Sequence, residues 1–83
     1  MGIVYILQSE STKRYYVGST NGLERRLAEH HRAHSLATRG RGPWRLMFQE
    51  EYKTLGEAQR RELEIKRWKS RRMIRDLIER AVG

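Results

Sequence analysis

One carboxylate stands where an apolar side chain is expected. In a helix over residues 54–69, spacings of three and four define a face that carries Leu55, Ala58, Glu62, Ile65 and Lys69. Burying an unpaired carboxylate is costly, so Glu62 needs a partner. Two interpretations stay open: an ion pair with a nearby arginine, or a hard divalent ion that takes one inward carboxylate plus phosphate oxygens.

Arg26 and His30 form a second candidate group. They are four residues apart, so a helix over residues 21–35 places both on one face. An arginine can stabilise charge that grows on a phosphoryl group, and a histidine can hold a proton or a phosphate. The alternative is an ordinary solvated face of a basic helix.

Tyrosines and a glycine come from two expected strands, over residues 3–7 and 14–18. Tyr15 and Tyr16 are neighbours, so they point to opposite faces and cannot both face one site. Tyr5 and Tyr16 serve as bases only where nearby positive charge lowers the phenol pKa; otherwise a strand tyrosine is packing. Gly18 marks a bulge, a close backbone approach or simply the end of the strand.

Positive charge is in excess. Eighteen Lys and Arg stand against ten Asp and Glu, which leaves a net charge of +8. Such a balance favours a polyanionic partner, and nucleic acid is the commonest; the alternative is that the charge serves solubility alone. Two basic stretches are expected to contact a phosphate backbone, through Arg39 and Arg41 in a loop and Lys66, Lys69 and Arg71 further along.

The pattern of elements predicts an α+β fold. Strands are expected over 3–7, 14–18 and 44–52, and helices over 21–35, 54–69 and 70–81. The first two strands should form an antiparallel hairpin with a loop of about five residues. The third strand is expected to place Leu46, Phe48 and Tyr52 on one side, and the inward face of the last helix should carry Met73, Ile74, Leu77, Ile78 and Ala81. Asn21 with Glu24, and Thr54 with Glu57, have the spacing of capping boxes at helix starts. The order strand, strand, helix, strand, helix, helix indicates a small three-stranded antiparallel sheet flanked by helices.

The size of the chain limits the possibilities. Its 83 residues predict one domain, 1–83, with a compact core. It has no cysteine, so disulfides and cysteine-based zinc sites are excluded. The longest apolar run, residues 3–7, is too short to span a bilayer, and no signal peptide is evident, so an intracellular, cytoplasmic protein is expected.

Taken together, the segments IVYIL…YYVGST, LERRLAEH and EAQRRELEIKRWK resemble the GIY-YIG nuclease domain over nearly the whole chain. More closely, the chain resembles the short stand-alone bacterial GIY-YIG proteins, the UPF0213-like group. Ile3-Val4-Tyr5 stands where that family has Gly-Ile-Tyr, without the leading glycine, and Tyr16-Val17-Gly18 stands for Tyr-Ile-Gly.

The resemblance implies a role for each candidate residue. Arg26 corresponds to the family's catalytic arginine, His30 to a histidine of many active members, and Glu62 to the metal-binding glutamate. Hydrolysis would then use one Mg²⁺ or Mn²⁺ ion at Glu62, with Arg26 stabilising the transition state. Tyr16 or Tyr5 would activate water with help from His30. Ser19 stands where some members have lysine.

The expected function is a structure-preferring or weakly specific endonuclease that cuts DNA, or RNA, as a monomer. The resemblance suggests DNA repair as its setting. Without an added recognition domain, binding should depend on phosphate contacts and on salt. The alternative is a nucleic-acid-binding module with little or no catalysis. A membrane-surface role for the last helix is less consistent, because its apolar residues are needed in so small a core.

Overall fold

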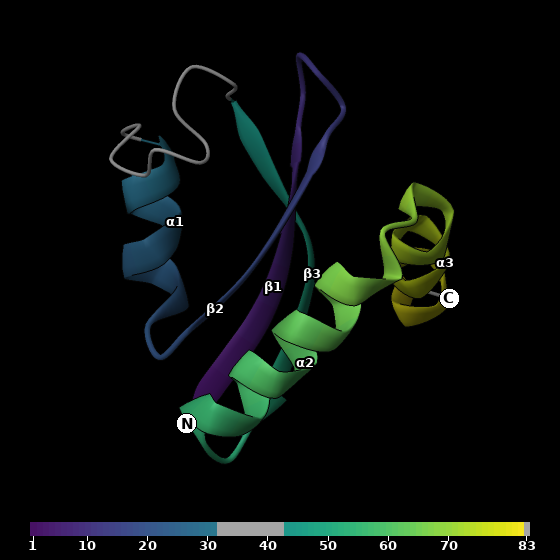
Figure 1. Ribbon diagram of the computed structural model, residues 1–83. Helices are drawn as coiled ribbons and strands as arrows, with labels where there is room; N and C mark the ends of the chain where they lie inside the picture. Colours follow the sequence, from purple (N-terminus) through teal and green to yellow (C-terminus); the bar gives the residue numbers. More distant parts are fainter. Residues whose placement is uncertain (32–42, 83) are drawn as a thin grey trace.

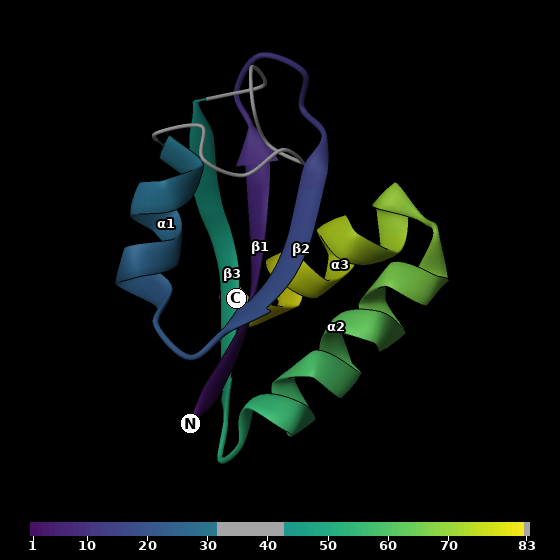
Figure 2. The same cartoon turned by 60° about the vertical axis from the view of Figure 1, so that its left-hand side comes forward.

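The computed structural model describes residues 1–31 and 43–82. Three strands and three helices follow one another in this part of the chain, in the order expected from the sequence: β1 (Gly2–Ser9), β2 (Tyr15–Thr20), α1 (Leu23–His31), β3 (Trp44–Tyr52), α2 (Leu55–Trp68) and α3 (Arg71–Val82). The strands form one antiparallel sheet in the order β2-β1-β3. Helix α1 covers one face, and α2 and α3 cover the other (Figures 1 and 2).

Strand β1 is central because both of its faces are apolar. Val4 and Ile6 point toward α2 and α3, where they join a core with Val17, Phe48, Ile65, Leu77 and Ile78. Tyr5 and Leu7 point to the other face and pack with Trp44 and, at its rim, with Leu23 and Leu27 of α1. A strand covered on both sides by helices reads as a continuous apolar run, as residues 3–7 do.

The β1–β2 hairpin has the predicted five-residue loop, residues 10–14. Lys13 adopts a left-handed conformation there, with φ of 64°, and its amide donates to the Ser9 carbonyl at 2.9 Å. The resulting register pairs Tyr5 with Gly18 and Leu7 with Tyr16. Residues directly opposite in an antiparallel pair share a face, so these four side-chain positions lie on the α1 side of the sheet.

Strand β3 contains an irregularity that the sequence pattern does not reveal. Leu46, Phe48 and Tyr52 were expected on one side of the strand, but the pairing with β1 shifts between Ile6 and Leu7. Phe48 and Tyr52 therefore pack in the core beneath α2 and α3, joined by Met47. Leu46 is 39% exposed, so the simple alternation predicted for this strand is wrong at that position.

The two capping predictions have different outcomes. Thr54 caps α2 as predicted, because its side-chain oxygen accepts from the Glu57 amide at 3.2 Å. The box expected at Asn21 is wrong: α1 begins at Leu23, the Gly22 carbonyl accepts from the Arg26 amide, and Asn21 Oδ1 accepts from Arg25 Nη2. The Gly22 amide is bonded to Thr20 Oγ1, so the chain turns one residue later than the box would require.

Helix α3 buries a narrower stripe than expected. Leu77 and Ile78 are buried and Ile74 packs at the edge of the core. Met73 is 44% exposed and Ala81 is exposed as well, so the prediction that both face inward is wrong. The helix is packed chiefly against β3, and a single contact surface on so small a sheet leaves its flanks in solvent.

Candidate active site

Tyr5 reaches the edge of the sheet across a glycine. Its ring lies over Gly18 of the edge strand β2, and a Cβ placed on Gly18 would be 2.6 Å from the Tyr5 hydroxyl and 2.7 Å from Cζ. Real Cβ atoms do not come so close, so glycine is required here for space. Of the interpretations left open for this residue, the close approach is the one the structure displays.

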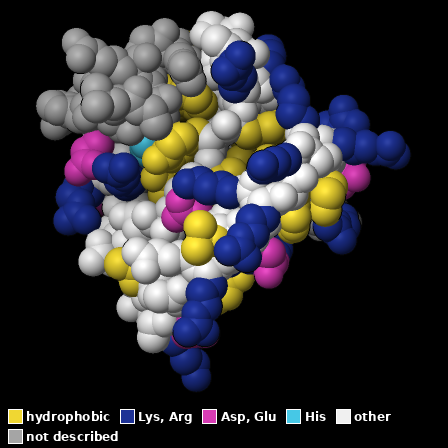
Figure 3. Space-filling view, in the orientation of Figure 1, with side chains coloured by type: hydrophobic (Ala, Val, Ile, Leu, Met, Phe, Trp, Pro, Cys, Tyr) yellow, Lys and Arg dark blue, Asp and Glu magenta, His cyan; other side chains and the backbone are white. Residues whose placement is uncertain are grey.

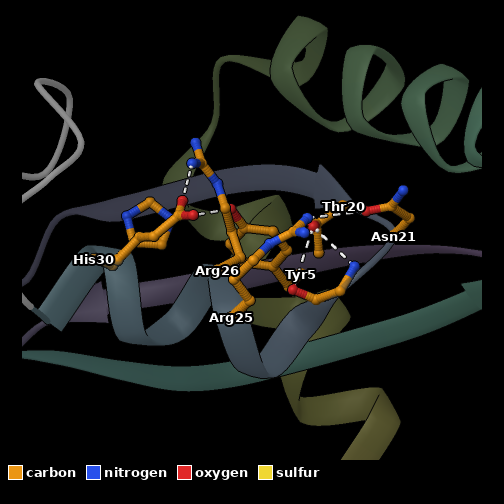
Figure 4. A network of polar contacts seen from close by, with 8 residues as sticks. Tyr5, Thr20, Asn21, Arg25, Arg26 and His30 are labelled. Carbon is orange, nitrogen blue, oxygen red and sulfur yellow. Dashed lines mark hydrogen bonds and ion pairs between the residues drawn. The ribbon is translucent and has the colours of Figure 1, made fainter.

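His30 of α1 meets Tyr5 in the interior. The Tyr5 hydroxyl and His30 Nε2 are 2.9 Å apart, and His30 is only 2% exposed (Figure 4). The Tyr16 ring contacts the imidazole edge to face at 4.9 Å between centroids. Burial lowers the pKa of His30 below 6.5, and the nearby positive charge of Arg26 lowers it further. The imidazole is therefore neutral at neutral pH.

Arg26 lies beside Tyr5, one helical turn before His30 (Figure 4). Its Nη1 donates to Glu29 Oε2 at 2.6 Å, and this bond is the largest of the interactions that raise the pKa of Arg26. The hydroxyls of Tyr5 and Tyr16 also interact with the guanidinium and raise its pKa. About a third of the Arg26 side chain is exposed, at 34%, so a permanent positive charge faces solvent beside two phenols.

The two phenols differ in their access to solvent. Tyr5 is fully buried, and burial raises its pKa to about 12 even though Arg26 acts in the opposite direction. Tyr5 therefore keeps its proton at neutral pH. Tyr16 is only partly buried, and it packs against the Tyr5, Leu7 and Trp44 cluster. Tyr16 is consequently the phenol that can touch a molecule in solution.

Glu62 reaches the same segment of β2 from the opposite face of the sheet. Its carboxylate accepts a hydrogen bond from the Ser19 hydroxyl and pairs with Lys66 Nζ at 2.5 Å. Ser19 follows Gly18, so the carboxylate and the Tyr5 hydroxyl approach adjacent residues of one edge strand. The negative charge of Glu62 adds a small upward contribution to the Tyr5 pKa, which also indicates that the two groups are near.

The structure thus brings the predicted residues together in two sets. Tyr5, Tyr16, Arg26 and His30 converge on the α1 side of β2, and Glu62 lies on its α2 side. Because β2 is an edge strand, side chains from both faces can meet around its free edge. The ion pair considered for Glu62 is present, but its partner is a lysine on the same helix rather than an arginine.

Sequence reasoning missed two contacts of the site. Ser19 was noted only as a replacement for lysine, yet its hydroxyl donates to Glu62. Its place in the alternation of β2, on the face opposite Gly18, is the signal that would have found it. Glu29 was not considered, although its spacing of three from Arg26 on one helix is that of an ion pair.

The residues predicted to contact a phosphate backbone are partly described. Arg39 and Arg41 lie outside the described residues. Lys66 pairs with Glu62, and Lys69 ends α2 in a left-handed conformation with φ of 50°. Arg71 begins α3, and its Nη2 donates to the Lys13 carbonyl at 3.0 Å.

The oxygen ligands around Glu62 fit a hard divalent ion. No group of three or more His, Cys, Asp or Glu side chains is gathered in residues 1–31 and 43–82, so a cage made entirely of protein ligands is absent there. One carboxylate with an adjacent hydroxyl suits Mg²⁺ or Mn²⁺, which keep several waters and share substrate phosphate oxygens. Lys66 is 48% exposed, so its ammonium can move into solvent when a cation takes its place.

Comparison with known proteins agrees with the fold and identifies the family. The sequence profile of the GIY-YIG catalytic domain matches residues 1–75, and the chain belongs to this family of nucleases. Its members act on nucleic acids and generally depend on a metal ion. In the part of the chain that the structure describes, no helix has the length and apolar character needed to cross a membrane.

Within the family, the chain is a member of the UPF0213 group. It is 45% identical over 65 residues to a UPF0213 protein of Nitratidesulfovibrio vulgaris, covering 77% of this chain and 58% of that protein's length. A Clostridium perfringens relative is 41% identical over 68 residues, covering 81% and 72%. The solution structure of a UPF0213 protein from Bacillus halodurans superimposes with a TM-score of 0.59 at 36% identity, covering 95% of this chain and 84% of that one.

Proposed function

We propose that this protein is a weakly specific or structure-preferring endonuclease that hydrolyses DNA phosphodiester bonds with one Mg²⁺ or Mn²⁺ ion. The observation that carries the proposal is the meeting of Tyr16, Arg26 and His30 around Tyr5, whose ring lies over Gly18, next to the strand position where Ser19 binds Glu62. The basic side chains of residues 1–83 would contact mainly phosphates, which carry no sequence information, so sequence preference through this part of the chain would be low.

Each side chain has a role in the proposed reaction. Arg26 donates to the non-bridging oxygens of the scissile phosphate, where negative charge grows in the transition state. His30, neutral at neutral pH, accepts a proton through the Tyr5 hydroxyl, which is hydrogen-bonded to its Nε2. Tyr16, partly exposed, orients the attacking water, while buried and protonated Tyr5 fixes the imidazole.

Glu62 would hold the divalent ion, with Ser19 orienting the carboxylate. When bound, such an ion neutralises charge on the phosphate and on the leaving oxygen. Lys66 neutralises Glu62 in the structure, and release of this pair frees a cation beside the DNA backbone. Cytoplasmic DNA repair is the setting proposed for this activity.

A second candidate function is nucleic-acid binding without hydrolysis. The observation in its favour is the Glu62–Lys66 pair, because a carboxylate already neutralised by a lysine needs no metal ion. The two functions differ in what Glu62 does: it is essential in a nuclease and dispensable in a binding module.

Cleavage and binding assays of Glu62→Gln separate the two candidates. Single-stranded, nicked, branched and duplex DNA would be incubated with Mg²⁺ or Mn²⁺, and binding measured separately in a chelator. We expect Glu62→Gln to lose cleavage by about a hundredfold or more, the equivalent of roughly 3 kcal/mol of transition-state stabilisation, while DNA affinity is kept.

Glu64→Gln is the matched control. Glu64 lies two residues further along α2, is 59% exposed, and pairs with Arg61 away from β2. This variant should cleave like the wild type. If the wild-type protein cuts none of the four DNA structures at high concentration but binds them in the chelator, the nuclease proposal is wrong and the binding module stands.

A further inference from the structure

Four side chains form a basic recess away from Glu62 and from the phenols of Tyr5 and Tyr16. It lies where the first residue of β2 meets the beginning of α3, its volume is about 220 Å³, and its lining consists of Tyr15, Arg71, Arg72 and Arg75. The recess combines one aromatic ring with three guanidinium groups and contains no carboxylate among its lining side chains.

 

Arg71 is held in place within this recess. Its Nη2 donates to the Lys13 carbonyl at 3.0 Å, and its guanidinium lies 5.6 Å from the centre of the Tyr15 ring. Tyr15 in turn packs against the core beneath α2 and α3. A guanidinium has five N–H donors, so one bond to Lys13 leaves donors for an anion.

Among the described residues, the guanidinium groups of the recess have no carboxylate partner. In residues 1–31 and 43–82, no ion pair joins Arg71, Arg72 or Arg75 to an acidic side chain. The first turn of α3 carries two arginines and no acidic residue, whereas the first turn of α2 carries Glu57. Cations at a helix N-terminus oppose the helix dipole, so this placement does not serve the stability of α3.

The recess and Glu62 lie on the same face of β2. Tyr15, Val17 and Ser19 alternate onto the face that α2 covers, and Ser19 is the residue that binds Glu62. Four residues of strand separate Tyr15 from Ser19, which is about 13 Å. Basic side chains gather over the turn between α2 and α3 and near the tip of the hairpin (Figure 3).

We propose that Tyr15, Arg71, Arg72 and Arg75 form a second phosphate-binding site, which anchors the DNA backbone on one side of the cleavage position. A duplex strand has one phosphate per 3.4 Å of axis, roughly, so about 13 Å corresponds to about four base-pair steps. The polynucleotide assignment rests on the proposed function, and the site supplies affinity rather than catalysis.

Salt-dependent DNA binding tests this site without any cleavage. Affinity for duplex DNA would be measured in a chelator at about 50 and about 200 mM salt, for the wild type and for Arg72→Ala/Arg75→Ala. Each lost phosphate contact lowers the slope of log affinity against log salt by about 0.9. The loss caused by the double variant should therefore be about tenfold larger at the lower salt concentration.

The control variant is Arg60→Ala/Arg80→Ala. It removes the same charge from places already lined by carboxylates: Arg60 beside Glu50, Glu57 and Glu64, and Arg80 beside Asp76 and Glu79. Its salt slope should change by less than half as much. Equal changes in the salt slope of both double variants would show that the recess is not a specific phosphate site and that net charge alone determines the affinity.

Inorganic pyrophosphate provides a second arm of the experiment. If Arg72→Ala/Arg75→Ala loses pyrophosphate binding while its DNA affinity and salt slope match the wild type, the recess holds small anions and the DNA assignment is wrong. Neither measurement requires hydrolysis, so this test can be interpreted even if the nuclease proposal is wrong. A protein that binds DNA through the recess but never cuts it would refute only the endonuclease.

Discussion

Replacing Gly18 with alanine tests the close approach of Tyr5 to β2. The new Cβ would be 2.6 Å from the Tyr5 hydroxyl, whereas ordinary contact begins at 3.4 Å, so the ring must move by about 0.8 Å. Tyr5 is fully buried and has little room for this movement. Overpacking of this kind costs about 1–3 kcal/mol, and the bond to His30 should weaken as the ring shifts.

Urea unfolding would measure the cost, and a second glycine supplies the control. Gly56 is exposed in α2, and its Cβ would meet only Thr54 Oγ1 at 3.9 Å. Gly56→Ala should therefore stabilise the protein by about 0.5–1 kcal/mol, because glycine is unfavourable inside a helix.

A double-mutant cycle with Tyr5→Phe locates the clash. Removing the hydroxyl relieves the 2.6 Å contact but leaves Cζ at 2.7 Å, so Gly18→Ala should cost less in the Tyr5→Phe background without becoming neutral. If Gly18→Ala is as stable as the wild type in both backgrounds, Tyr5 does not lie across Gly18 and the geometry of the candidate site is wrong.

Two further predictions concern pH and helix capping. Burial lowers the His30 pKa below 6.5, so the unfolded chain binds a proton at this residue before the folded protein does as pH falls. The contribution of neutral His30 to the free energy of unfolding is complete above about pH 6.5. It is lost as pH falls through the lower folded-state pKa. Urea midpoints between about pH 7.5 and 5 should thus decline less in His30→Gln, and parallel curves would contradict the assignment. Thr54→Ala should lower the free energy of unfolding by about 1 kcal/mol in the same assay, because the Glu57 amide loses its acceptor. Thr54→Ser, which keeps the hydroxyl, should retain most of the wild-type stability. An unchanged midpoint for Thr54→Ala would show that the cap does not stabilise the protein.

Local patterns were enough to predict the order of elements and much of the core. The apolar run of β1 and the Thr54 cap are signals contained within a few residues, and both have the expected structural result. Asn21 fails as a cap because Thr20 and Gly22 make a competing bond, which spacing alone does not weigh. The irregularity near Leu46 depends on how β3 pairs with β1, so a single strand's alternation does not reveal it.

In the candidate site, too, local sequence patterns predicted some features, and others depend on the tertiary structure. Arg26 and His30 were found from their spacing on one helix, and Glu62 from its place on an apolar stripe. The bond between Ser19 and Glu62 joins residues 43 positions apart, and it exists only because α2 packs across the edge strand. The raised pKa of Tyr5 likewise comes from burial that the sheet and α1 create together. Such properties require the tertiary arrangement.

Strand β2 places side chains on both faces of the sheet, so the register set by the hairpin turn determines which of its residues reach the candidate site. Tyr16 and Gly18 face α1, and Tyr15 and Ser19 face α2, because the strand pairs with β1 in one register. A slip of one residue that brought Ser19 against the Tyr5 ring would also move Tyr16 to the position of Tyr15 and Val17 to the position of Tyr16. An insertion or deletion in this turn is therefore compatible with the candidate site only if it leaves the pairing intact, so a segment remote from the site is under the same geometric constraint.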